Sequence, residues 1–297
     1  MAIQPVSFRL YEQGFDGFAE ALGGSFERYG FAVVADHGLA PAMVAAALDD
    51  AKAFFALPEA AKRRYRIAGG AGQRGYTPFA VETAKGAEHA DLKEFWHVGR
   101  AGNVWPDEIA GFQARIGGLY AAFDRLGQRL LEAIARHLGL PRGHFAAAVA
   151  DGESILRLLH YPPTAGAGPA LRAGAHEDIN AITLLLGAEE AGLELLDRDG
   201  RWLAVNPAPG SLVVNIGDML QRLTNHRLPS TTHRVVNPTP ERSGAARYSM
   251  PFFLHFAPDY LIETLPGCID AASPDRYPEP ITARAYLAER LEEIRLA

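Results

Sequence analysis

The chain has 297 residues, 48% of them hydrophobic and 22% charged, and its formal net charge is −6 at pH 7. This composition is typical of a globular protein and argues against non-specific nucleic-acid binding, which requires a strongly basic face. Cys268 is the only cysteine, so an intramolecular disulfide and a cysteine-based metal cluster are excluded. The first five residues lack the features of a signal peptide, and no apolar run approaches the ~18 residues of a membrane span. We therefore expect a cytoplasmic protein without membrane or nucleic-acid partners, whereas the sequence does not predict its oligomeric state.

The first half of the chain predicts a mixed α/β region followed by packing helices. The expected elements are a strand at 5–10, a helix to about Tyr29, a strand at 31–35, a helix from Pro41 to about Phe55, a loop at 69–75 and a strand at 91–98. From 106 to 140, apolar residues recur every three or four positions, which predicts a long amphipathic helix. We expect the helices of residues 101–150 to pack against the outside of a sheet.

After Glu153 the pattern changes to short β-like runs separated by turn residues. These runs are 154–161, 182–186, 193–196, 202–205, 212–216, 231–236 and 247–255. Such spacing favours a β-sandwich or barrel. Pro162–Gly174 is expected to form a mobile loop, and residues 281–296 a closing helix. Because no linker separates the parts, we expect residues 1–100, 101–150 and 151–297 to form one structural unit.

The triplet His176-Glu177-Asp178 suggests a metal site. If this segment is extended, His176 and Asp178 project from the same face and can reach one ion. One imidazole and one carboxylate are two-thirds of the facial triad that holds non-haem Fe(II). His233, which lies in a β-branched run, is the natural third ligand, although an H-x-D triplet alone is a weak signal.

Two further pairs of polar residues are expected on the inner faces of strands. Arg247 and Ser249 share one face of the last predicted strand. A dicarboxylate ligand would give the buried guanidinium a bidentate partner and would accept a hydrogen bond from the serine; an internal acid is the structural alternative. Arg157 and Tyr161 share a face of an earlier strand. Tyr161 is a candidate donor to a carboxylate, and Arg157 either pairs with an acid or recognises an anionic substrate.

In this order, the motifs resemble the isopenicillin N synthase-like branch of the Fe(II)/2-oxoglutarate-dependent dioxygenases. His233 follows Asp178 by 55 residues, and Arg247-Tyr248-Ser249 begins 14 residues after His233. The flanking segments are similar too: Tyr29-Gly30-Phe31, Asp36-His37-Gly38, Leu158-Leu159-His160-Tyr161-Pro162-Pro163 and Val214-Asn215-Ile216-Gly217-Asp218-Met219. The resemblance covers nearly the whole chain. Members of the family commonly have Asn in place of Asp36 and in place of Leu159.

The resemblance implies a mainly β fold, a double-stranded β-helix (jelly roll) flanked by N-terminal helices and a long packing helix. The site residues it implies are His176, Asp178 and His233 for Fe(II), and Arg247, Ser249 and Tyr161 for 2-oxoglutarate. Such an enzyme consumes O2 and 2-oxoglutarate, releases succinate and CO2, and oxidises a small organic substrate. Hydroxylation, desaturation and ring closure are equally compatible with the sequence, and the identity of the substrate is not predicted.

Arg157, Asn180 and Phe253 are candidates for the wall of the substrate pocket, with an anionic substrate as one hypothesis for the arginine. Two alternative functions remain open. The first is an Fe(II)/O2 oxidase of the same fold that does not use 2-oxoglutarate, in which Arg247 and Ser249 would bind the substrate's carboxylate. The second is a catalytically silent jelly-roll protein that binds a metal or a small molecule. The complete triad argues against the second alternative.

Overall fold

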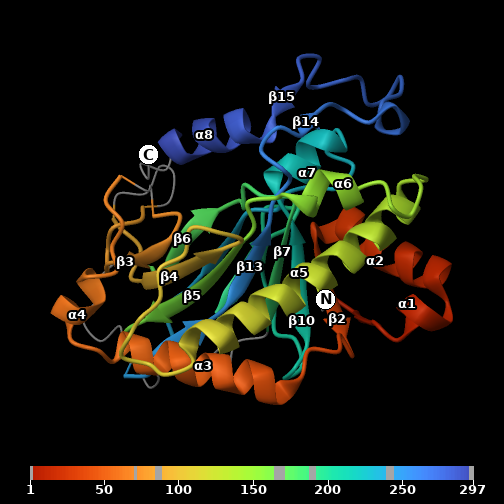
Figure 1. The fold of residues 1–297 in the computed structure, drawn as a ribbon. Helices are drawn as coiled ribbons and strands as arrows, with labels where there is room; N and C mark the ends of the chain where they lie inside the picture. The colour runs from red at the N-terminus through yellow and green to blue at the C-terminus, as the bar shows by residue number, and fades with distance from the viewer. Residues whose placement is uncertain are drawn as a thin grey trace.

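The computed structural model describes residues 3–69, 72–83, 89–163, 171–186, 192–238 and 244–293, whose arrangement is shown in Figure 1. The larger of its two main sheets has the strand order β1-β2-β10-β7-β13-β5-β4-β3, and β12 also pairs with β5. The smaller sheet has the order β6-β11-β8-β9. Side chains from both sheets line one cavity between them. This double-sheet architecture confirms the predicted jelly roll.

The strands are β1 (Pro5–Ser7), β2 (Phe31–Ala35), β3 (Gly75–Thr77), β4 (Glu94–Gly99), β5 (Ile155–Tyr161), β6 (Ala173–His176), β7 (Ile182–Leu186), β8 (Leu193–Leu196), β9 (Trp202–Ala204), β10 (Leu212–Ile216), β11 (His233–Val235), β12 (Arg247–Ser249), β13 (Pro251–Leu254), β14 (Leu261–Ile262) and β15 (Ile281–Thr282). The helices are α1 (Leu10–Gln13), α2 (Phe15–Tyr29), α3 (Pro41–Phe55), α4 (Glu59–Arg63), α5 (Phe112–His137), α6 (Ala146–Ala150), α7 (Asp218–Leu223) and α8 (Ala283–Glu293), with a 3-10 turn at Pro266–Cys268.

The long helix α5 lies across the outer face of the larger sheet (Figure 1). Its apolar stripe packs on β7 and β13, and α2 and α3 lie against its sides. The helix was predicted within 106–140 and spans a shorter range because glycines in the left-handed conformation flank it. Gly111 has φ 76° at its N-terminus, and Gly139 has φ 77° just after its C-terminus.

Alternation along β5 separates the helix-packed core from the cavity. Leu156 and Leu158 are fully buried in the core cluster that also contains the apolar stripe of α5. Arg157, Leu159 and Tyr161 point to the opposite face and line the cavity between the sheets. Because successive side chains of a strand point to opposite faces, polar side chains at the odd-numbered positions face the cavity.

Gly30 ends α2 and lets the chain turn beside the segment that carries His233. Its φ of 66° is in the left-handed region, which favours glycine. A Cβ atom at this position would collide with the Pro229 carbonyl oxygen and the Thr231 hydroxyl. The close approach therefore packs the α2–β2 turn against the chain two residues before His233.

Three predicted elements differ in detail. The run expected at 247–255 is divided into β12 and β13, because Pro251 has no N–H to donate and β13 changes partners, pairing with β7 as well as β5. β6 ends at His176, so Asp178 lies beyond the strand and not within it. The C-terminal helix begins at Ala283, after the short strand β15.

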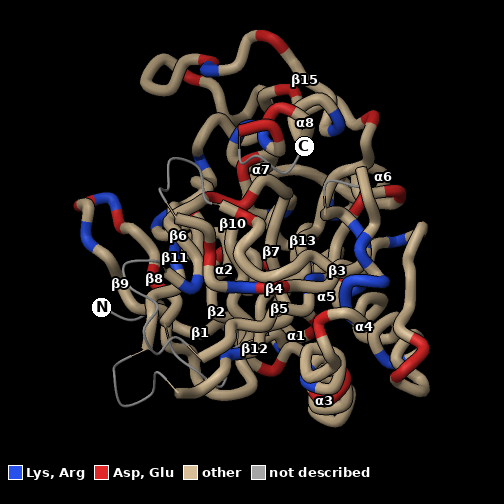
Figure 2. The backbone as a smooth tube through the Cα atoms, turned by 90° about the vertical axis from the view of Figure 1, so that its left-hand side faces the viewer, with Lys and Arg blue, Asp and Glu red and all other residues tan. Residues whose placement is uncertain are grey.

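Parts of three predictions fall on residues that the structure does not describe. Residues 70 and 71 of the predicted loop 69–75 lie outside the described ranges. The predicted loop 162–174 includes residues 164–170, which lie outside the described ranges, and its last two residues belong to β6. Residues 294–296 of the predicted C-terminal helix also lie outside these ranges. Within the described part of the chain, no helix combines the length and the apolar character needed to cross a membrane. Figure 2 shows basic and acidic residues interspersed along the backbone.

Candidate metal and cosubstrate site

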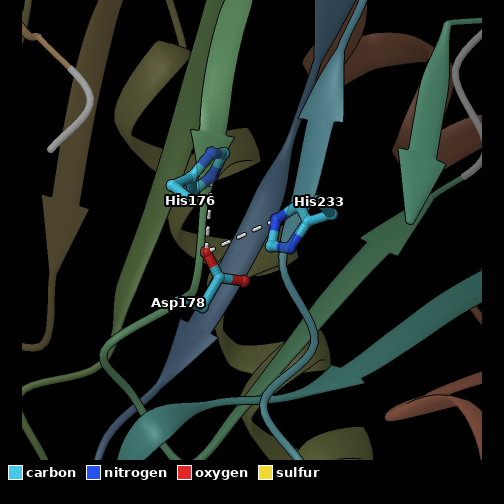
Figure 3. Close-up of side chains that lie close together, drawn as sticks. All are labelled: His176, Asp178 and His233. Carbon is cyan, nitrogen blue, oxygen red and sulfur yellow. Dashed lines mark ion pairs between the residues drawn. The ribbon is translucent and has the colours of Figure 1, made fainter. Parts of the chain in front are cut away.

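Three side chains, two from neighbouring strands and one from the segment just after β6, meet at one point of the cavity (Figure 3). His176 ends β6, His233 begins β11, and the two residues are direct partners in the antiparallel register. The Nε2 atom of each histidine lies 3.8 Å from Oδ1 of Asp178. The three potential ligand atoms all lie within 4.8 Å of one another, an arrangement that could hold a metal ion. The structure therefore brings together the three residues predicted as metal ligands.

Backbone carbonyls orient both imidazoles. Nδ1 of His176 lies 2.7 Å from the carbonyl oxygen of Gly174, and Nδ1 of His233 lies 3.1 Å from that of Thr231. A carbonyl oxygen only accepts, so each Nδ1 carries the proton and donates. Each Nε2 is then a lone-pair donor aimed at the same point, which is the orientation that metal-binding histidines need.

The carboxylate of Asp178 is fixed by two buried polar side chains. Its Oδ2 accepts a hydrogen bond of 2.5 Å from the Thr183 hydroxyl and one of 2.8 Å from the Asn215 amide. Oδ1 is thereby turned towards the histidines. Sequence reasoning missed these two supporting residues, although each is a polar residue at an inward position of an otherwise apolar strand, β7 or β10.

The protonation states of His176 and Asp178 favour a cation between the three residues. Burial, followed by the neighbouring charge of His233, lowers the pKa of His176 to about 4. Burial raises the pKa of Asp178, but the two histidines and its two hydrogen bonds outweigh that effect and lower the pKa below its usual value. At neutral pH the site therefore presents a neutral imidazole at His176 and an ionised carboxylate, the forms that coordinate Fe(II).

The three residues predicted to bind 2-oxoglutarate lie together in the same cavity as the triad. Arg247 of β12 pairs in register with Tyr161 of β5, and its guanidinium carbon lies 5.0 Å from the centre of the tyrosine ring. Only 2% of Arg247 is exposed, and Ser249 on the same face is buried as well. One cavity thus contains the candidate metal triad and a buried guanidinium, an arrangement that fits a dicarboxylate able to reach both.

The predicted substrate residues surround a second, adjoining cavity. Arg157, Asn180 and Phe253 all line it, together with His176 and Asp178. The guanidinium carbon of Arg157 lies 5.2 Å from the centre of the Phe253 ring. The amide of Asn180 is engaged within the protein, because it donates to the Ile182 carbonyl oxygen and to the Thr183 hydroxyl.

Arg157 pairs with an acid in the structure, which was one of the two alternatives for this residue. Its NH2 atom lies 3.3 Å from Oε2 of Glu82. Glu82 also pairs with Lys93, and Lys93 pairs with Asp91. Sequence reasoning missed these three residues, because the strand expected at 91–98 gives no sign that its Asp91 and Lys93 meet the distant Glu82.

Comparison with known proteins identifies the family. The model of the 2OG-Fe(II) oxygenase superfamily matches residues 152–256, and that of the non-haem dioxygenase N-terminal region, described for morphine synthesis, matches residues 6–109. A 2-oxoglutarate-Fe(II) type oxidoreductase of Aspergillus fumigatus is 33% identical over 282 residues, which cover 88% of this chain and 82% of that protein. Proline hydroxylase buaE of Petromyces alliaceus is 33% identical, with 93% of each chain covered.

Solved structures agree with this comparison. A 2OG-Fe(II) oxygenase family protein from Caulobacter crescentus is 60% identical, with a TM-score of 0.91 and 99% of each chain covered. A full-length Neurospora crassa protein in complex with alpha-KG and thymine is 28% identical, with a TM-score of 0.89, and the match covers 98% of this chain and 96% of that one.

The chain belongs to the 2OG-Fe(II) oxygenase superfamily. It is an Fe(II)- and 2-oxoglutarate-dependent dioxygenase, an oxidoreductase with a jelly-roll core and helical additions. The predicted class, fold and cofactors are confirmed, and the relatives fit this activity better than they fit the oxidase or the silent binding protein.

Proposed function

We propose that His176, Asp178 and His233 hold the Fe(II) ion, and that this site oxidises a small organic molecule bound in the cavity beside Arg157. The observation that carries the proposal is the convergence of two neighbouring imidazole Nε2 atoms and one fixed carboxylate oxygen within 4.8 Å. The donor set of two histidines and one carboxylate suits Fe(II) and leaves one face open to other ligands. When bound, the iron supplies the oxidising chemistry with O2 and 2-oxoglutarate.

Arg247 and Ser249 bind the distal carboxylate of 2-oxoglutarate in this proposal. Their burial in the triad's cavity supports it, because a guanidinium in a dry site forms strong bidentate pairs with carboxylates. Tyr161 flanks Arg247 in the same cavity and is the third residue proposed to contact the cosubstrate. Where other members have Asn, Leu159 gives this wall an apolar surface.

The prime substrate is a small molecule. The similar Neurospora crassa protein binds thymine, and a relative from Petromyces alliaceus is named a proline hydroxylase, so small cyclic molecules are the first class to test. We also propose that residues 151–297 form the oxygenase core, with 1–100 and 101–150 packed on it as one unit. The pairing of β2 with β10 and of β4 with β5 supports their packing as one unit, because strands of residues 1–100 share a sheet with strands of the core. A cytoplasmic location stays a prediction.

The test is an anaerobic titration of the metal-free protein with Fe(II) and 2-oxoglutarate, followed by the visible charge-transfer band of their chelate. We expect the band in the wild type and its loss or weakening in His176→Ala and Arg247→Ala. Matched controls are His144→Ala and Arg136→Ala, since His144 is exposed and Arg136 pairs with Asp16 on the surface. Iron binding without a band in the wild type would favour the oxidase and make Arg247 a substrate ligand. Absence of iron binding would refute the proposal.

A further inference from the structure

The cavity beside the triad contains an arginine whose surroundings restrict what it can bind. Arg157 projects from β5 into this cavity. Its guanidinium carbon lies 4.2 Å from the centre of the Phe95 ring and 5.2 Å from that of Phe253. Aromatic rings therefore lie against the guanidinium, and the N–H groups at its edge are the ones that can reach a ligand.

Part of that edge is already occupied by an acid and a neutral histidine. The NH1 and NH2 atoms lie 3.4 and 3.3 Å from the two carboxylate oxygens of Glu82, and Nε donates to Nε2 of His97 over 2.5 Å. His97 donates from Nδ1 to the carbonyl oxygen of Gly72, so its Nε2 is an acceptor. Burial, and then the charge of Arg157, lowers the pKa of His97 well below its usual value, and the ring adds no charge.

A second cation and a second acid complete the cluster. Nζ of Lys93 lies 2.5 Å from Glu82 and 2.8 Å from Asp91. All four side chains are largely buried, with exposed fractions of 15% for Arg157, 12% for Glu82 and 5% each for Lys93 and Asp91. Two cations and two anions cancel, so this cluster of four side chains has no net charge. An anionic ligand on Arg157 would lie next to the Glu82 carboxylate and would be repelled by it.

A neighbouring cavity does not supply an attraction for anions either. It shares His176 with the cavity beside Arg157, and its lining includes Glu177, Asp218 and Glu293. Its additional cation, Arg290, is paired with Asp218 at 3.1 Å and with Glu293 at 2.7 Å. This neighbouring cavity is therefore lined by more acids than bases.

Arg157 nevertheless keeps hydrogen-bonding capacity. A guanidinium has five N–H groups. One donates to His97 and one to Glu82, and NH2 lies 3.3 Å from the second Glu82 oxygen as an ion pair. At least two N–H groups therefore have no hydrogen-bond acceptor among the residues that the structure describes. They can donate to an oxygen of a bound molecule without a new pair of charges being formed.

We propose that this cavity selects an uncharged substrate with a carbonyl-type oxygen, such as an amide, a lactam or an imide, and that Glu82 enforces the selection by neutralising Arg157. The carbonyl oxygen accepts from the unoccupied N–H groups of Arg157, and the body of the molecule lies against Phe253. This inference rests on the proposed function for the position of the reacting molecule. It replaces the anionic substrate that was one hypothesis from the sequence.

Three probes of the same shape and different charge test the proposal: benzamide, benzoate and benzamidine. Calorimetry is carried out anaerobically on the protein loaded with Fe(II) and saturating 2-oxoglutarate, so that Arg247 is already occupied. We expect the wild type to bind benzamide at least about tenfold more tightly than benzoate, the smallest effect expected for a charge-assisted contact. Benzamidine should also bind more weakly than benzamide, because it has no oxygen to accept from Arg157.

Variants assign the selection to Glu82. Glu82→Gln should raise the affinity for benzoate about tenfold and change that for benzamide little, whereas Arg157→Met should weaken benzamide about tenfold. Glu194→Gln is the matched control, since Glu194 also pairs with an arginine but lies on the smaller sheet. If Glu82→Gln does not fold, Glu82→Asp replaces it and should keep the wild-type order of affinities.

The proposal is overturned if the wild type prefers benzoate or benzamidine to benzamide. It is also overturned if Glu82→Gln leaves the affinity for benzoate unchanged. Failure of the proposed function is a separate result, because the charge-transfer band of the Fe(II)–2-oxoglutarate chelate is recorded on the same sample before any probe is added.

Discussion

Replacing Thr183 with valine should weaken Fe(II) binding without disturbing the fold. The substitution keeps the shape of the side chain but removes the hydroxyl that donates to Oδ2 of Asp178 over 2.5 Å. A hydrogen bond to a charged group contributes roughly 1.5–3 kcal/mol. Loss of a residue that orients a metal ligand typically weakens metal binding about 10–100-fold, which is an energy of the same size.

The second donor to Asp178 decides where in that range the effect falls. The Asn215 amide still holds Oδ2 at 2.8 Å, so the carboxylate of the Thr183→Val protein stays partly oriented. We therefore expect about a tenfold rise in the Fe(II) dissociation constant for Thr183→Val, and a rise towards about 100-fold when Asn215→Leu is added. The two effects are coupled because both donors serve one oxygen.

The assay is the anaerobic Fe(II) titration in the presence of 2-oxoglutarate, with thermal unfolding recorded on the same metal-free samples. Thr224→Val is the matched control, because Thr224 is fully buried and its hydroxyl donates over 2.8 Å to the Leu220 carbonyl oxygen in α7. An Fe(II) affinity of Thr183→Val within about twofold of the control would refute the reasoning that this hydroxyl orients Asp178.

Two further predictions concern stability. Gly217→Ala should lower the free energy of unfolding by roughly 1–3 kcal/mol, because the new Cβ would collide with the backbone oxygen of Asn180. The control is Gly118→Ala in α5, where the new Cβ would point into open space and the substitution should be neutral or stabilising. Urea denaturation of both variants measures the difference. Burial, with the charge of Glu177, raises the pKa of Asp218 to about 6 from 3.8, so the folded protein holds a proton that the unfolded chain releases. This group's contribution to the free energy of unfolding is complete below about pH 4 and is lost as the pH rises to about 6, a decrease of up to about 3 kcal/mol. Asp218→Asn should abolish this decrease when the free energy of unfolding is measured across the same pH range.

The sequence predicts the strands and the inward positions of several site residues because both depend on local alternation. The odd-numbered positions of β5 and β12 place Arg157, Tyr161, Arg247 and Ser249 towards the cavity, as the period of two requires. The expectation that His176 and Asp178 share one face of a strand was not the reason that they meet. Asp178 lies in the segment after β6, and the two hydrogen bonds to its carboxylate, rather than strand geometry, orient it towards His176.

The partners of these residues could not be predicted, because they come from distant parts of the chain. Glu82 is 75 residues before Arg157, and Asn215 is 37 residues after Asp178. Neither a hydrogen bond nor an ion pair at such separation leaves a periodic signal. Pairing of Arg157 was one of two stated alternatives, and only the tertiary structure identifies the acid and shows that a second cation shares it.

The paired strands β4 and β5 have buried charged residues on both faces, and this arrangement restricts how they can pair. On the cavity side, His97 is opposite Arg157 in the register, and on the helix side Glu94 is opposite His160 at 2.7 Å. Glu94 also pairs with Lys62 at 2.7 Å. A shift of one residue would turn every side chain of one strand to the wrong face. Each buried charge would then lose its partner, at a cost of roughly 3–5 kcal/mol per broken pair, against a total stability of about 5–15 kcal/mol for a typical protein. The charge pairs that neutralise the substrate cavity therefore also oppose a register shift that would remove Arg157 from it.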